Sequence, residues 1–241
     1  MSQGSLMKKV IVISGVTSGV GEELSRTFID LDWLVVGLAR NKEKLKKLTH
    51  EFGKNFTAIE TDITDENSVA ASFKFINNQF KKITLLVNNA AVFKMEKFSQ
   101  CSFNDINSMI DTNLKGAMYC TLEAVQIMKA SSHSARIINV ASVAAIHGIK
   151  GQAIYCASKF GLNGFAEALN QELIQEGISI TTLYPGGINT PLWNETNPYP
   201  GENKEEILQP KDVVSVIKYV SELESRIILK NLTIFPSNEW H

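Results

Sequence analysis

The stretch VIVISGVTSGVG, residues 10–21, carries the pattern that decides the fold. An apolar run enters a turn with glycines at 15, 19 and 21, and an amphipathic segment follows at once. Strand, tight turn and helix in this order suit the binding of a dinucleotide. Glycines let the backbone approach a pyrophosphate, and the helix N-terminus offers it unpaired N–H groups. Glycines also serve ordinary tight turns, so the turn alone leaves the function open.

Short apolar segments recur along the chain between longer amphipathic ones. They are continuous in Val, Ile and Leu, which is typical of parallel strands covered by helices on both faces. We predict strands over Val10–Ser14, Trp33–Leu38, Phe56–Glu60, Ile83–Asn88, Arg136–Ala141, Ile178–Tyr184 and Leu232–Phe235. Helices are expected over Gly19–Leu31, Lys42–Glu51, Glu66–Phe80, Phe103–Lys129, Gln152–Glu176 and Lys211–Leu223. The predicted fold class is therefore α/β: a single-domain Rossmann-type, doubly wound, mostly parallel seven-stranded sheet with helices on both faces.

The length of 241 residues suits one α/β domain with a full core and is too short for two ordinary domains. We expect this domain to span residues 8–241, preceded by a tail over residues 1–7 that can include vector-derived residues. Asp65 is expected to cap the third helix, and Gly177 to end the fifth in a left-handed conformation. Residues 191–209 form the one long irregular insertion, so we expect a lid there.

Composition restricts the class of partner. Lysine plus arginine (24) nearly balances aspartate plus glutamate (25), so no strong field favours nucleic acid or an anionic membrane. No window approaches the roughly 18 unbroken apolar residues of a membrane span. The three cysteines are widely spaced, and an odd number cannot form a closed disulfide framework, so a reducing compartment fits best. We expect a cytoplasmic protein with a small-molecule partner, without nucleic acid or membrane.

Four residues downstream of the glycine turn, Asn113, Ser142, Tyr155 and Lys159, describe a site that moves hydride on a nicotinamide cofactor. Tyr155 and Lys159 are four apart in a predicted helix, so phenol and ammonium share one face. The ammonium favours phenolate, and lowering a phenol pKa from about 10 to about 7 requires roughly 4 kcal/mol. Ser142 ends the fifth predicted strand, where its hydroxyl would hold the substrate oxygen.

Each of these residues also has a simpler interpretation. Asn113 stands mid-helix, an unfavourable place for asparagine without a specific task, yet it could merely mark a kink. Ser142 could cap a strand end, and Tyr155 with Lys159 could form a surface contact. Singly these interpretations would prevail, but the ordered set on suitable elements favours the functional one.

Metal and hydrolase chemistry are not favoured by the pattern. The four histidines lack metal-ligand spacing, so no metal site is predicted. Ser142 lacks the Gly-x-Ser-x-Gly elbow of an α/β hydrolase, although His147 and Cys156 follow nearby. Cys156 is most simply a small buried apolar residue.

The end of the second predicted strand bears on the choice of cofactor. An acidic residue about twenty residues past the turn normally grips the ribose 2′-hydroxyl of NAD. Here the strand ends in GLAR, residues 37–40, so no carboxylate repels a 2′-phosphate and Arg40 can accept one. NADP is therefore preferred to NAD, although Arg40 could also be a solvated loop residue or stack on adenine.

With turn and tetrad both in place, the sequence resembles a short-chain dehydrogenase/reductase of the one-domain kind over essentially its whole length. The matching blocks stand in the family's order: SGxxxGxG over residues 14–21, Asp62-Ile63, NNAA over 88–91, Asn113, Ser142, YxxxK over 155–159 and PGGINT over 185–190. Ala91 replaces the family's usual glycine and Ser14 its usual threonine. Both changes are small for small, though Ala91 could narrow the space beside the cofactor.

The resemblance implies roles for particular residues. Cofactor contacts would come from the turn, the strand ends and the two catalytic helix residues: Gly15, Thr17, Ser18, Gly19, Val20, Gly21, Arg40, Asp62, Ile63, Asn89, Ala90, Tyr155, Lys159, Pro185, Gly186, Ile188 and Thr190. Asp62 and Ile63 would hold the adenine, and Asn89 and Ala90 would line the adenosine side. Ile188 and Thr190 would contact the carboxamide, and Lys159 the nicotinamide ribose. Asn113 would position a water that relays protons to Lys159.

These features predict an NADP(H)-dependent oxidoreductase that moves hydride between nicotinamide and a small carbonyl or secondary alcohol, with Tyr155 as general acid/base. The expected pocket residues are mainly apolar, without an arginine cluster, which favours a neutral or weakly polar substrate: Phe93, Met95, Ala144, Ile146, His147, Trp193 and Tyr199. One alternative is a 3-oxoacyl-thioester reductase served by an acyl carrier protein. Another is a non-catalytic dinucleotide-sensing protein, which would need a damaged tetrad. The resemblance of the helices over 103–129 and 152–176 to the family's interface helices implies a homodimer or homotetramer.

Overall fold

The computed structural model describes residues 8–131, 134–201 and 203–237, so the expected tail over residues 1–7 lies outside the described residues. Within these ranges seven strands form one sheet in the order β3-β2-β1-β4-β5-β6-β7, and every pairing is parallel. The strands are β1 (Val10–Ser14), β2 (Leu34–Ala39), β3 (Phe56–Glu60), β4 (Leu85–Asn88), β5 (Ala135–Val140), β6 (Ile178–Pro185) and β7 (Asn231–Ile234). The predicted single-domain α/β fold is confirmed.

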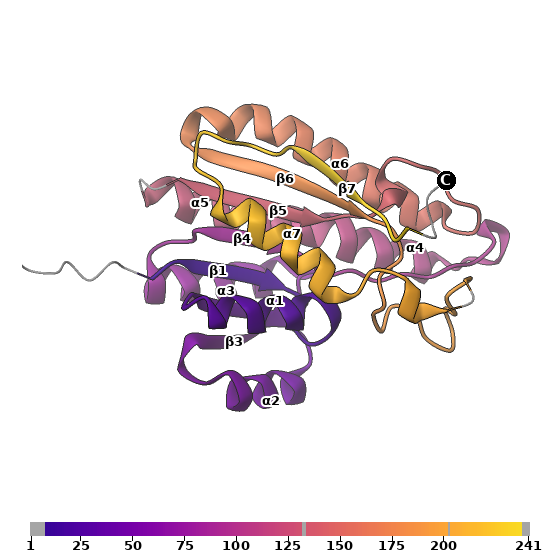
Figure 1. Ribbon diagram of the computed structural model, residues 1–241, viewed down its shortest axis with the longest axis horizontal. Helices are drawn as coiled ribbons and strands as arrows, with labels where there is room; N and C mark the ends of the chain where they lie inside the picture. The colour runs from indigo at the N-terminus through magenta and orange to yellow at the C-terminus, as the bar shows by residue number, and fades with distance from the viewer. Residues whose placement is uncertain (1–7, 132–133, 202, 238–241) are drawn as a thin grey trace, which may run out of the picture.

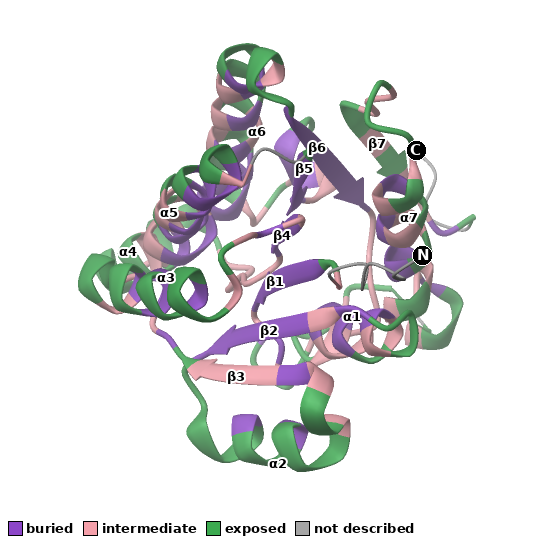
Figure 2. Cartoon of the chain, turned by 90° about the vertical axis from the view of Figure 1, so that its left-hand side faces the viewer, coloured by how far each residue is buried: buried purple, intermediate pink, exposed green. Residues whose placement is uncertain are grey.

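The helices cover both faces of this sheet (Figures 1 and 2). They are α1 (Gly19–Asp30), α2 (Lys42–Phe52), α3 (Glu66–Phe80), α4 (Phe103–Ile110), α5 (Gly116–Ala130), α6 (Ala153–Leu173) and α7 (Pro210–Glu222). Successive strand residues point to opposite faces, so Val12 packs with Phe73 and Cys120 under α3 and α5. Its neighbour Ile13 packs with Leu24 and Val213 under α1 and α7. Two apolar layers thus enclose the sheet.

The strand order positions the site. The chain runs outward from β1 to β3 and then returns to place β4 on the other side of β1. In open sheets of this kind the crevice for a ligand lies at the carboxyl ends of the strands where the order reverses. The irregular segment over residues 191–201 and 203–209 lies beyond these strand ends (Figure 1), and its short 3-10 turn is η6 (Lys204–Glu206).

Helix ends behave as expected at two positions. The Asp65 carboxylate accepts a hydrogen bond from the Asn67 N–H, 3.0 Å away, and so caps α3. Gly177 has a φ of +74° after the turn that ends α6. Both predictions are confirmed.

The predicted single helix over 103–129 is wrong in one respect. It is divided into α4 and α5 by one π-helical turn, η3 (Asp111–Lys115). A π turn inserts an extra residue into a helix and occurs frequently at functional sites. Asn113 lies in this turn, and its side chain is bound to the backbone of Val92. The contact outside the helix explains the irregularity.

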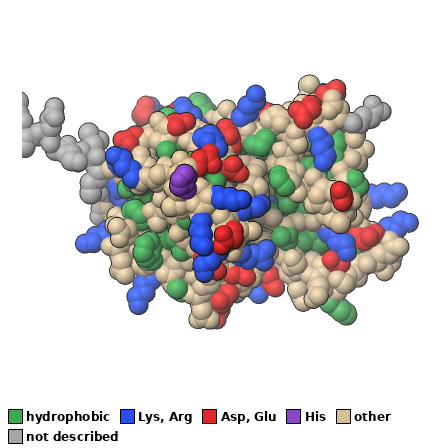
Figure 3. Space-filling model, turned by 90° about the horizontal axis from the view of Figure 1, so that it is seen from below, with side chains coloured by type: hydrophobic (Ala, Val, Ile, Leu, Met, Phe, Trp, Pro, Cys, Tyr) green, Lys and Arg blue, Asp and Glu red, His purple; other side chains and the backbone are tan. Residues whose placement is uncertain are grey.

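Charges are mixed on the surface. Figure 3 shows lysine and arginine side chains interspersed with aspartate and glutamate on one face.

On the described part of the chain, no helix is both long enough and apolar enough to cross a bilayer.

Candidate active site

The conformation of the turn over residues 14–21 requires its glycines. Gly15 and Gly19 have φ of +77° and +57°, a region that L-residues with a side chain rarely adopt. A Cβ on Gly21 would stand 2.1 Å from the carbonyl oxygen of Gly15. Ser18 precedes α1, and within the described chain its side chain makes no capping hydrogen bond. The first turn of α1 therefore presents backbone N–H groups that suit an anionic ligand.

Ser14 and Asn89 join this turn to the end of β4. The Ser14 hydroxyl accepts hydrogen bonds from the N–H groups of Asn89 and Ala90, each at 3.1 Å. The Asn89 amide donates to the carbonyls of Ser14 and Gly15 at 3.0 and 3.1 Å. Asn89 thus supports the turn with its side chain while also lining the cavity described next. The serine keeps the hydroxyl that this junction uses.

A cavity of about 870 Å³ opens along the carboxyl ends of the central strands. Such a volume is within the range of ligand pockets. The structure brings these sequence-predicted residues to its wall: Gly15, Thr17, Ser18, Gly19, Val20, Arg40, Asp62, Ile63, Asn89, Ala90, Ser142, Tyr155, Lys159, Pro185, Gly186, Ile188 and Thr190. Gly21 and Asn113 are the exceptions: both are buried behind the wall.

The expected substrate-side residues are only in part correct. Phe93, Trp193 and Tyr199 line the cavity, as predicted. Met95, Ala144, Ile146 and His147 do not belong to its wall. The 3-10 turn η4 (Val143–Ala145) buries Ala144 completely and is followed by exposed residues at 146 and 147. Ile149, Gln152 and Leu192 line the cavity instead, and no periodicity in these loops signals it.

Tyr155 and Lys159 are buried on α6 at the cavity wall. Tyr155 is 8% exposed and Lys159 is 2% exposed, and the Lys159 Nζ lies 5.6 Å from the centre of the phenol ring. The ammonium donates a hydrogen bond of 3.0 Å to the carbonyl of Val140. Since an ammonium has three donors, the arrangement leaves capacity for acceptors in the cavity.

Burial dominates the protonation of both groups. It lowers the pKa of Lys159 to about 8. It also raises the pKa of Tyr155 to about 12, and a hydrogen bond with Ser142 acts in the opposite direction. In the chain by itself, desolvation of the phenolate outweighs the hydrogen bond with Ser142, and a phenol pKa near 7 during turnover stays a prediction. At neutral pH Tyr155 carries its proton, as a proton donor must.

Ser142 makes the local cap that the simpler interpretation expected, and its contact with a substrate oxygen stays a prediction. Its Oγ accepts a hydrogen bond from the Ala144 N–H at 3.1 Å, which caps η4 at the end of β5. The same hydroxyl is the hydrogen-bond partner of Tyr155. A local cap thus orients a hydroxyl beside the phenol.

Asn113 contacts other groups than the resemblance implied. Its Oδ1 accepts from the Val92 N–H at 2.8 Å, and its Nδ2 donates to the Val92 carbonyl at 2.9 Å and to the Ser158 Oγ at 3.1 Å. The residue is 1% exposed. It therefore ties the segment after β4 to α6, beside Tyr155 and Lys159, and a role in water positioning stays a prediction.

Arg40 lies exposed at the end of β2 and lines the cavity. The pKa of the nearby Asp62 carboxyl is lowered. Burial acts to raise this pKa, but two hydrogen bonds from Thr64 and the positive charge of Arg40 outweigh the effect of burial. Glu60 at the end of β3 is paired with Lys42 at 2.8 Å. This end of the cavity accordingly places the guanidinium of Arg40 near the ionised carboxylate of Asp62, while Glu60 is paired with Lys42 outside the cavity lining.

The proteins that this chain resembles agree with the catalytic site described above. A family model described as short chain dehydrogenase matches residues 9–200. An uncharacterized oxidoreductase of Staphylococcus aureus strain MW2 is 28% identical over 232 residues, which are 96% of this chain and 98% of the relative.

Two solved structures match nearly the whole chain. The closed form of a serine dehydrogenase complexed with NADP+ has a TM-score of 0.88 at 27% identity and covers 96% of both chains. A 3-ketoacyl-(acyl-carrier-protein) reductase from Brucella melitensis complexed with NADH has a TM-score of 0.89 at 26% identity, over 98% of this chain and 100% of that one.

Proposed function

Because the chain belongs to the short-chain dehydrogenase/reductase family, we propose that it is an NADP(H)-dependent oxidoreductase acting on a small neutral carbonyl or the corresponding secondary alcohol. The observation that carries the proposal is the buried pair of Tyr155 and Lys159, with Ser142 beside the phenol, at the wall of the 870 Å³ cavity. Burying an ammonium with one internal acceptor costs free energy, so a functional reason for it is favoured.

The cavity residues fit a nicotinamide dinucleotide. The N-terminus of α1 would hold the pyrophosphate, and the spare donors of Lys159 would hold ribose hydroxyls. When bound, the reduced nicotinamide supplies the hydride that adds to the carbonyl carbon.

The chain's own residues would supply the proton. Tyr155 donates its phenolic proton to the carbonyl oxygen as negative charge develops there, while the Ser142 hydroxyl hydrogen-bonds to the same oxygen. The phenolate left behind is stabilised by the Lys159 ammonium, which is charged at neutral pH because its pKa is about 8. In the reverse direction the phenolate takes a proton from the alcohol.

Preference for NADP rests on Arg40. It lies at the end of β2, where a carboxylate would be needed to select NAD, and α2 begins two residues later. The NADP+ complex of the serine dehydrogenase supports this choice, whereas the Brucella reductase was solved with NADH.

The proposal is tested by following NADPH consumption with purified protein across a panel of ketones and aldehydes. Wild type should oxidise NADPH only when a carbonyl is present. Tyr155→Phe should bind NADPH with nearly unchanged affinity and lose turnover, since only the proton donor is removed. Turnover by Tyr155→Phe at the wild-type rate would refute the role of the phenol.

A second candidate is reduction of a 3-oxoacyl thioester on an acyl carrier protein, which the likeness to the Brucella reductase favours. A carrier protein is acidic and needs unpaired cations around the mouth of the site. Lys94, on the segment after β4, is paired with Asp105 at 2.9 Å and so offers little to such a partner. Failure to reduce any acyl thioester would remove this candidate. A purely dinucleotide-sensing role is disfavoured because the catalytic residues lie together.

We further propose a cytoplasmic homodimer or homotetramer. Leu122 on α5 is 61% exposed and Phe160 on α6 is 46% exposed, and apolar side chains on two helices suit burial against a second copy. Sedimentation of the purified protein tests this, and a monomer at micromolar concentration would refute it.

A further inference from the structure

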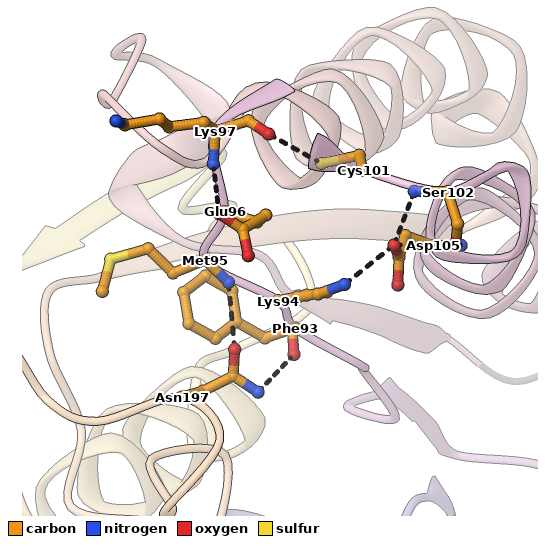
Figure 4. A network of polar contacts seen from close by, with 9 residues as sticks. All are labelled: Phe93, Lys94, Met95, Glu96, Lys97, Cys101, Ser102, Asp105 and Asn197. Atoms are coloured by element: carbon orange, nitrogen blue, oxygen red, sulfur yellow. Dashed lines mark hydrogen bonds and ion pairs between the residues drawn. The ribbon is translucent and has the colours of Figure 1, made fainter. Parts of the chain in front are cut away.

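An asparagine of the segment over residues 191–201 and 203–209, called the lid below, binds the backbone beside the active site. Asn197 is 9% exposed. Its Oδ1 accepts from the Met95 N–H at 3.0 Å, and its Nδ2 donates to the Phe93 carbonyl at 3.2 Å (Figure 4). A side-chain amide thus bonds to the backbone of residues 93 and 95 as a neighbouring strand would.

The segment held by Asn197 is also held from inside the protein. Asn113 binds both backbone groups of Val92, at 2.8 and 2.9 Å, and also contacts Ser158 on the catalytic helix α6. Two asparagines therefore hold the backbone of this segment, Asn113 at Val92 and Asn197 at Phe93 and Met95. The contact made by Asn197 joins the lid to the part of the chain that faces Tyr155.

This junction assembles a row of aromatic rings. Phe93 packs edge to face on Tyr155, with ring centres 4.9 Å apart, and on Trp193 at 5.1 Å. Trp193 in turn packs on Tyr199 at 5.3 Å. All four residues line the cavity, so the rings form a wall that begins at the proposed proton donor. We call these four residues the aromatic wall.

The charges around the cavity are unfavourable for an anionic substrate. Among the described lining residues the cations are Arg40, which follows β2, and Lys159, on α6 beside Tyr155. The lid contributes Glu206 to the lining, and this carboxylate has partners of its own, including Asn203. A carboxylate on the substrate would meet apolar rings here; Lys204 of the lid lies outside the cavity lining and donates to the Trp193 carbonyl at 3.1 Å.

We propose that Asn197 is a specificity-determining positioning residue: its clasp on Phe93 and Met95 builds the aromatic wall, which selects uncharged ketones that carry an aromatic substituent. This inference rests on the proposed function. Stacking on aromatic rings rewards a flat apolar group, and a carboxylate placed among these rings would lose hydration.

The lid offers a clean variant because its turn is supported independently. The Asn194 Oδ1 accepts hydrogen bonds from the N–H groups of Thr196 and Asn197 and from the Thr196 hydroxyl. Asn197→Ala removes the clasp without touching these bonds. Asn197→Asp keeps the acceptor for Met95 and loses the donor for Phe93. Glu195→Ala is the matched control, since it changes an exposed side chain of the same turn.

The experiment measures the NADPH-dependent reduction of three ketones. Acetophenone and 2-butanone are methyl ketones, and benzoylformate carries a carboxylate in place of the methyl group. Wild type should show the highest kcat/KM with acetophenone, by about tenfold over each of the others. Asn197→Ala should lower the acetophenone value about tenfold, mainly through KM, and change the 2-butanone value by less than about threefold. Asn197→Asp should fall between, and Glu195→Ala should match wild type. NADPH affinity should stay unchanged in every variant.

An equal loss with acetophenone and 2-butanone, or no loss, would overturn the specificity role, and a wild-type preference for benzoylformate would overturn the substrate class. If wild type reduces other carbonyls of the panel but none of these three ketones, the substrate class fails and the proposed function stands; if it binds NADPH but reduces no carbonyl of the panel, the proposed function fails as well. Hydrogen exchange then tests the clasp alone: the Met95 amide should exchange about tenfold faster in Asn197→Ala than in Glu195→Ala. Equal exchange would refute the clasp.

Discussion

Replacing Lys159 by methionine should stabilise the protein while abolishing its turnover. Lys159 is 2% exposed, and burial lowers its pKa from 10.5 to about 8. At about 1.4 kcal/mol per pKa unit, keeping this ammonium charged costs the folded state about 3 kcal/mol at pH 7. Methionine fills a similar volume without charge but loses the hydrogen bond to Val140, worth about 1 kcal/mol. The net gain is therefore about 2 kcal/mol.

The gain should depend on pH in a defined direction. Between pH 8 and 10.5 the unfolded lysine binds more protons than the folded one, so wild-type stability rises relative to the variant in this range. The advantage of Lys159→Met should accordingly be full at pH 7 and shrink as the pH approaches 10.5. Tyr155 has a raised pKa of about 12, which makes stability fall above pH 10 in both proteins and so cancels from the comparison.

Urea unfolding and thermal melting measure this difference. A gain of about 2 kcal/mol predicts a Tm higher by about 4–8 °C for a chain of this size. Lys47→Met is the control, because Lys47 is an exposed residue of α2, and it should change stability by less than about 0.5 kcal/mol. If Lys159→Met is no more stable than wild type at pH 7, burying the Lys159 ammonium does not cost the folded state the free energy on which this prediction rests.

Two further predictions concern the cofactor end of the site. Arg40→Ala should weaken binding of NADPH by about tenfold or more and of NADH by much less, as measured by isothermal titration, because a charge-assisted contact to the 2′-phosphate is lost; equal losses would argue against that contact. Ser14→Ala should lower the free energy of unfolding by about 1–3 kcal/mol, since the N–H groups of Asn89 and Ala90 lose their acceptor. Ser14→Thr, which keeps the hydroxyl, is its control, and an unchanged urea midpoint for Ser14→Ala would count against the junction.

The fold was predictable because its signals are local. A buried strand running into glycines, as at residues 10–21, has few alternatives, and the continuous apolar strands indicate a sheet covered on both faces. The π turn at Asp111–Lys115 was not predictable in this way. Hydrophobic periodicity averages over several turns, and the cause of the insertion is a contact between Asn113 and Val92, which are distant in sequence.

The sequence predicted which side chains would lie together in the site, but not their pKa values or the residues of the substrate-side wall. The spacing of Tyr155 and Lys159 places phenol and ammonium together, but their pKa values depend on burial, which spacing does not report. The substrate-side wall lies in loops without periodicity. The prediction therefore named Ile146 and His147, whereas Ile149 and Gln152 line the cavity. Asn197 gave no signal, because its partners are backbone groups about a hundred residues away.

The central claim is hydride transfer from a nicotinamide to a carbonyl carbon with Tyr155 as proton donor. Its most direct test is to incubate the protein with NADPH deuterated at the transferred position and acetophenone, and to analyse the alcohol by mass spectrometry. We expect one deuterium on the carbinol carbon with wild type and no labelled alcohol with Tyr155→Phe. Tight NADPH binding with no labelled alcohol formed from any carbonyl of a broad panel, or equal labelling by Tyr155→Phe, would contradict this mechanism.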